Sequence, residues 1–142
     1  MTTSSGTDQM LDVPLYVIAH SRSGDKGDTS NMSLIAYRPA AYDVLVEQVT
    51  VERLQQWFST RRPARITRYL LPQLHALNIV LEGALDGGVN RALNLDAHGK
   101  SLSFFLLDMR LRLPAHSLHR ISGIPNPEQY VAAAPAALPD HA

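Results

Sequence analysis

The sequence contains no cysteine, no excess of charge of either sign and no long hydrophobic run. Without cysteine, the chain cannot form a disulfide framework, a thiolate nucleophile or a zinc–thiolate site. Thirteen basic and thirteen acidic residues cancel, so the charge does not indicate binding to nucleic acid or to an anionic membrane. No segment reaches the roughly 18 consecutive apolar residues of a membrane span. The polar stretch MTTSSGTDQMLD lacks the features of a signal peptide, and we expect a cytoplasmic protein.

The 142 residues, 45% of them hydrophobic, suit one folded domain with a single core. We predict a flexible leader over residues 1–12, the domain over residues 13–114 and a Pro/Ala-rich C-terminal extension over residues 115–142. Five of the nine prolines fall within residues 114–139, and the last residues offer little to bury. We therefore expect the extension to lie against the domain or against a partner.

Apolar runs typical of strands alternate with segments of helical spacing. The predicted strands are residues 15–19, 32–37, 64–71 and 109–114. In the strand over residues 64–71, we expect the basic residues on one face. Residues 41–60 predict one helix or two short ones, the second capped by Thr50. Residues 74–85 suit either a strand or a helix. This alternation predicts an α+β sandwich, with an antiparallel or mixed sheet and helices on one face.

The polar segment SRSGDKGDTSN, residues 21–31, is either a solvated connection or a binding loop. Gly24 and Gly27 permit positive φ and a close approach of a ligand to the backbone, and Lys26 adds a positive charge. Consecutive amides in such turns can form a nest for an anion. The segment is not a Walker A loop, because no GKS or GKT follows the second glycine. It is longer and more polar than a hairpin requires, and we interpret it as a ligand-facing loop.

A second group of polar residues lies within the apolar segment 74–85. On a strand, Asn78 and Glu82 would share one face, where they either meet solvent, brace a loop or line a pocket. In a pocket, Glu82 is the best candidate general base and Asn78 a polarising donor. The following DGG predicts a turn, whose Gly87 and Gly88 could equally present backbone amides to a ligand.

The sequence does not predict a metal site or a cofactor. The six histidines lack metal-ligand spacing. The oxygens of Asp25, Asp28 and Asn31 do not match the EF-hand pattern. No serine triad or nucleophile elbow is present either.

Three ordered segments resemble a known family. They are SRSGDKGDTSN, RYLLPQLHALNIVLEGALDGGV and LNLDAHGKSLSFFLLDMRLRLP. Over about residues 15–113, they resemble the small ferredoxin-like domain found with acyclic terpene utilisation protein A (AtuA). The chain departs from the family pattern at His20, at Ile79 and at Asp86, which adds a negative charge to the second glycine turn.

The resemblance implies a ferredoxin-like α/β sandwich and favours a strand over residues 76–83. It also implies a link to a large AtuA-like subunit in acyl-CoA or branched-chain carboxylic acid catabolism. The matching motif positions point to functional roles for Ser23, Gly24, Asp25, Lys26, Gly27, Asn31 and Asn78.

The sequence is compatible with three functions. The first is an accessory subunit that completes a site for a CoA thioester or small carboxylate with an AtuA-like large chain. The second is a stand-alone lyase or hydratase, with Asp25 or Glu82 as base and Lys26 as electrophile. The third is a homo-oligomeric binding module. None of the three involves nucleic acid or a membrane.

Overall fold

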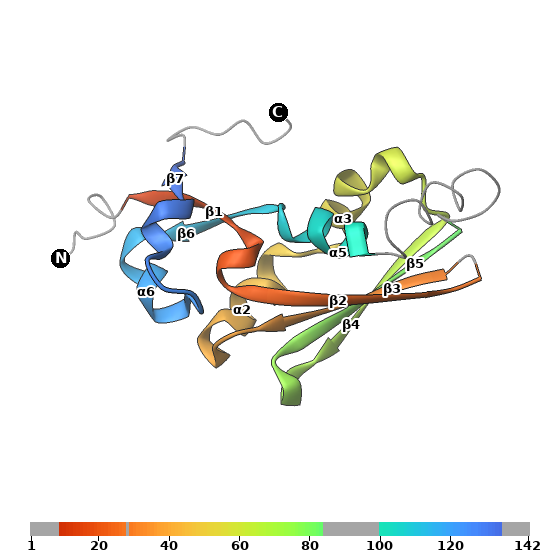
Figure 1. Cartoon of the computed structure of the whole chain (residues 1–142), viewed down its shortest axis with the longest axis horizontal. Helices are drawn as coiled ribbons and strands as arrows, with labels where there is room; N and C mark the ends of the chain where they lie inside the picture. Colours follow the sequence, from red (N-terminus) through yellow and green to blue (C-terminus); the bar gives the residue numbers. More distant parts are fainter. Residues whose placement is uncertain (1–8, 28, 84–99, 135–142) are drawn as a thin grey trace.

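The computed structural model describes residues 9–27, 29–83 and 100–134, without the side chains of Asp25, Lys100 and Ser101. The strands of these residues form two antiparallel sheets (Figure 1). The larger sheet has the order β2-β3-β5-β4 and consists of β2 (Ala19–Lys26), β3 (Thr29–Ala36), β4 (Arg65–Leu71) and β5 (Ala76–Glu82). The smaller has the order β6-β1-β7 and consists of β1 (Met10–Pro14), β6 (Arg110–Pro114) and β7 (Ala132–Ala133).

The helices gather on one face of the larger sheet and beside the smaller one. They are α2 (Pro39–Gln48), α3 (Val51–Trp57), α5 (Lys100–Leu107) and α6 (Leu118–Ile121). Helix α2 packs on β3 and β5, α3 on β4, and α5 on β2, while α6 contacts α2. The α+β class with helices on one face of an antiparallel sheet is therefore confirmed. None of the helices in the described part is both long and apolar enough to cross a membrane.

The polar segment 21–31 is a hairpin and not a long loop, so its interpretation as a loop was wrong. Its residues continue β2 and β3 until Lys26 pairs with Thr29, which leaves a two-residue connection. Gly27, the first of the two, has a φ of 64°. Two-residue hairpin turns require such left-handed values, which glycine adopts without strain. The Gly-Asp pair between two strands was the signal for this turn in the sequence.

The ambiguous segment 74–85 contains a strand, as the family resemblance implied. Leu77, Ile79 and Leu81 of β5 are buried, whereas Asn78, Val80 and Glu82 between and after them are only partly buried. In the register with β3, Ile79 lies opposite Met32. Alternating burial of this kind is typical of a sheet with one covered and one uncovered face.

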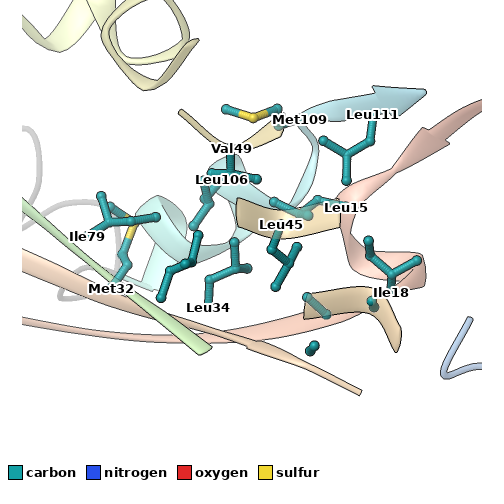
Figure 2. Close-up of a cluster of buried hydrophobic side chains, with 14 of the residues drawn as sticks. Leu15, Ile18, Met32, Leu34, Leu45, Val49, Ile79, Leu106, Met109 and Leu111 are labelled. Carbon is teal, nitrogen blue, oxygen red and sulfur yellow. The ribbon is translucent and has the colours of Figure 1, made fainter. Parts of the chain in front are cut away.

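The core fills the space between the larger sheet and its helices. Met32, Leu34 and Ile79 of the sheet meet Leu45 of α2 and Leu106 of α5 (Figure 2). All five side chains are fully buried. Burying such side chains stabilises the fold by roughly 1.5–3 kcal/mol each relative to exposure. The core therefore holds the helices on this one side.

Two helices occupy residues 39–57, and Thr50 separates them. The Thr50 side chain accepts a hydrogen bond from the backbone amide of Arg53 (3.2 Å), which caps α3. The sequence predicted either one helix or two short ones in this region, and the structure has two.

The basic residues of β4 do not share a face, contrary to the prediction. Arg65 lies on the uncovered side, whereas Arg68 lies on the helix side, because residues three apart on a strand point to opposite faces. The Arg68 Nη1 donates to the carbonyls of Val46 (2.7 Å) and Val49 (2.8 Å). These carbonyls lie at the end of α2, where the helix has no further amides to offer them.

The outer edge of β6 is closed by side chains from the helices. The Gln48 amide donates to the Arg112 carbonyl (2.6 Å) and accepts from the Arg112 amide (2.9 Å). Arg53 donates to the Arg110 carbonyl (2.7 Å). Burial lowers the pKa of Arg53, and the charge of Asp12 opposes this shift. These side chains take the place of a neighbouring strand and protect the edge from another chain.

Some residues that were assigned to the leader and to the C-terminal extension belong to the fold of the domain. Residues 10–12, assigned to the leader, lie in β1. Residues 115–134, assigned to the extension, place Leu118 and Ile121 in the core. Gly123 donates to the Val17 carbonyl (3.0 Å), and Arg38 donates to the Ser122 carbonyl (2.7 Å). The apolar side chains at positions 118 and 121 explain why this segment packs instead of extending away.

We expect Ile121→Ala to lower the free energy of unfolding by about 2–5 kcal/mol, because it removes a buried side chain and leaves a cavity. The neighbouring exposed residue provides the control, and Arg120→Ala should change stability by less than about 0.5 kcal/mol. Urea unfolding followed by circular dichroism measures both. Equal stability of the two variants would show that the segment is dispensable for the core.

Candidate functional site

The face of the larger sheet opposite the helices carries mostly polar side chains, and we call it the open face. Its side chains come from alternate positions of all four strands. They are His20, Arg22, Gly24, Lys26, Thr29, Asn31, Ser33, Ile35, Arg65, Thr67, Tyr69, Leu71, Ala76, Asn78, Val80 and Glu82. All of these residues except Ala76 are partly or fully exposed.

Five of the predicted site residues meet on the open face. Gly24 and Lys26 lie on β2, Asn31 on β3, and Asn78 and Glu82 on β5. Two segments about 50 residues apart in the sequence thus contribute to one surface, because β3 pairs with both β2 and β5. The sheet register, rather than a loop, brings these residues together.

The other predicted site residues either lie off the open face or fall outside the described part of the structure. Ser23 pairs with the buried Met32 and therefore faces the helices, away from Lys26. Gly27 belongs to the turn and not to the face. The side chain of Asp25 lies outside the described part of the structure, as do Gly87 and Gly88.

The structure adds residues that the sequence did not single out. One row across the sheet consists of Arg22, Ser33, Asn78 and Tyr69, and a second of Lys26, Thr29, Glu82 and Arg65. Adjacent strands lie about 4.8 Å apart, so each row spans roughly 14 Å. Only the period of two along each strand hinted at these positions, and the register was needed to align them.

Positive charge dominates the open face. Arg22, Lys26 and Arg65 are exposed cations, and Glu82 is the one carboxylate among the described residues of this face. Although the whole chain is neutral, its charges are therefore unevenly distributed. An uneven distribution of this kind favours an anionic ligand or an acidic partner surface, most strongly at low ionic strength.

Two cavities that the described residues line do not include the open face. A cavity of about 330 Å³ lies beside Arg38 and residues 122–127, and another of about 340 Å³ lies between α2 and β6. Neither includes a residue of the open face. Within the described residues, no group of three or more His, Cys, Asp or Glu side chains is placed to hold a metal ion.

Comparison with known proteins gives one match. A sequence model of the AtuA ferredoxin-like domain matches residues 13–112, which is more than half of the chain. Neither a curated protein nor a solved structure matches the chain. The matched range includes the four strands that form the open face and the helices α2, α3 and α5 that pack on them. The chain therefore belongs to the AtuA ferredoxin-like domain family.

Proposed function

We propose that this chain is an accessory domain that completes a ligand site together with an AtuA-like large chain. The ligand is a CoA thioester or a small carboxylate of acyl-CoA or branched-chain acid catabolism. The open face contributes the cationic side of this site, with Arg22 and Lys26 as its principal charges. Asn31 and Asn78 contribute amide donors on the two central strands.

One observation carries this proposal. The motif residues around Lys26 and those around Asn78 converge on the one sheet face that no described helix covers. An uncovered face is common in antiparallel sheets and is not by itself evidence of binding. What supports the proposal is that this face gathers the motif residues, whose hydrogen-bonding and charged side chains suit an anion.

The shape of the face favours a shared site over a complete one. Strongly bound small molecules usually lie in concave pockets that remove most of their surface from water. Neither of the two cavities lined by described residues includes the open face, and the proposal therefore takes the opposite wall of the site from another chain. An AtuA-like large chain is the partner that the family membership suggests.

Charge argues against self-association through the open face. Face-to-face pairing of two copies would bring six cations, three from each copy, against only two carboxylates. Like charges at an interface oppose association. The homo-oligomeric module is therefore less well supported than the accessory domain.

A stand-alone hydratase has one observation in its favour. Lys26 and Glu82 lie in the same row across the sheet, with Thr29 between them. However, they project from an exposed face, where bulk water competes with a substrate and weakens electrostatic effects. We therefore place this activity second.

We expect the double variant Arg22→Ala/Lys26→Ala to abolish the binding of acetyl-CoA by the isolated chain. A ligand at about 100 times its dissociation constant stabilises a protein by roughly 2.7 kcal/mol, which is visible as a raised melting temperature. Thermal shift at low salt provides the measurement. Arg120→Ala, which removes an exposed charge from α6, is the control and should bind as the unaltered chain does. Equal binding by the double variant would contradict the proposal.

The variant Glu82→Gln separates binding from catalysis. If the face binds an anion, loss of its carboxylate removes a repulsion, and affinity for acetyl-CoA should rise roughly two- to fivefold, as for exposed charge pairs of 0.4–1 kcal/mol. If Glu82 is a general base, the variant should instead lose hydration activity towards enoyl-CoA substrates. Titration calorimetry and a hydration assay on the same preparation distinguish these outcomes.

A further inference from the structure

Gly24 is a glycine that the fold itself does not require. Gly27 and Gly83 have φ values of 64° and 80°, which strain residues with a side chain. Gly123 packs so closely that a Cβ would lie 2.1 Å from the Cβ of Tyr37. Among the described residues, a Cβ at Gly24 would meet nothing within 4 Å, and the φ of this residue is not in the left-handed region. Neither backbone conformation nor packing explains the absence of a side chain there.

Glycine is an unfavourable residue at this position. Gly24 lies inside β2, paired with Asn31 in an uninterrupted register, so it does not mark a bulge. Glycine inside a strand weakens it, because the unfolded chain has more freedom to lose and no side chain packs. Where a strand glycine is not at a bulge or bend, a close approach of another molecule to the backbone is a common reason.

The surroundings of Gly24 indicate the chemistry of that molecule. Arg22 and Lys26 precede and follow it on the same face of β2, about 13 Å apart along the strand. Their long side chains can both reach a group above Gly24, and Asn31 adds an amide from the next strand. A single carboxylate needs only one cation. A diphosphate, which carries two linked anionic groups, makes use of both cations and of the space without a Cβ.

We infer that a diphosphate group lies directly over the backbone of Gly24, held between Arg22 and Lys26. This inference rests on the proposed function and narrows its ligand to a CoA-type diphosphate rather than a free carboxylate. Gly24 then acts as a specificity-determining residue, since the missing side chain admits the diphosphate to the face. A side chain at this position would lift the ligand away from the sheet.

The test uses two substitutions of increasing size, Gly24→Ala and Gly24→Val. The probes are inorganic pyrophosphate and acetate, titrated at low salt into the full chain and followed by the amide signals of β2 in NMR spectra. We expect the unaltered chain to bind pyrophosphate more tightly than acetate. Gly24→Ala should weaken pyrophosphate binding about tenfold, a change of 1.4 kcal/mol, and Gly24→Val should weaken it further.

Stability distinguishes this role from a structural one. Because the space above Gly24 is open, both variants should keep or raise the melting temperature, by up to about 4 °C for alanine. A clear fall in melting temperature would mean that the fold needs this glycine, and would overturn the inference. So would unchanged pyrophosphate binding in both variants.

The remaining outcomes separate the inference from the proposed function. If acetate binds as tightly as pyrophosphate, or if pyrophosphate does not bind, the diphosphate assignment is wrong. The proposed function would still stand if acetyl-CoA stabilises the chain and the double variant at Arg22 and Lys26 loses this effect. If acetyl-CoA binds neither the isolated chain nor its mixture with an AtuA-like large chain, both are wrong.

Discussion

The pairing of β5 with β3 and β4 is the constraint on which the rest of the structure depends. Side chains alternate along a strand, so the register that buries Leu77 and Ile79 also turns Asn78 and Glu82 to the opposite face. A slip of one residue would place a carboxylate in the core and leucine side chains in solvent. The free energy of core burial thus sets the positions of the polar residues. Core and candidate site are two faces of one sheet.

Elements outside the two sheets cover them in different ways. In the smaller sheet, the side chains of Gln48 and Arg53 form hydrogen bonds with the outer edge of β6. Helix α6, which contains Ile121, packs on α2. In the larger sheet, all the described helices that contact the strands do so from one side. Among the described residues, the helices thus cover one face of this sheet, and the polar side chains of the candidate site lie on the other.

This arrangement suits a domain that works with another chain. A solvent-exposed cationic surface attracts anions but does not by itself exclude water from them, so in the proposed function affinity and any reaction depend on what covers the ligand. In the function proposed above, an AtuA-like large chain has that role. The glycines of the chain differ in the same way. Gly27 and Gly123 serve the fold, whereas Gly24 leaves room on the open face.

Local sequence determined much of the fold class and several elements. Alternating apolar residues predicted β6, and Thr50 marked the start of α3, because period and capping are properties of a few adjacent residues. Local patterns failed where long-range contacts decide. The polar segment around Lys26 looked like a loop because its composition is poor in strand formers, yet pairing with β3 holds it in a strand.

Several parts of the candidate site followed from the tertiary structure alone. The sequence marked Lys26, Asn31 and Asn78 as functional candidates, but it did not align them with Arg22 and Tyr69. That alignment depends on which strands are neighbours and in which register, and both depend on burial summed over the whole core. The sequence therefore determined which residue types were available for binding. The packing of the sheet decided which of them share a surface and which, like Ser23, do not.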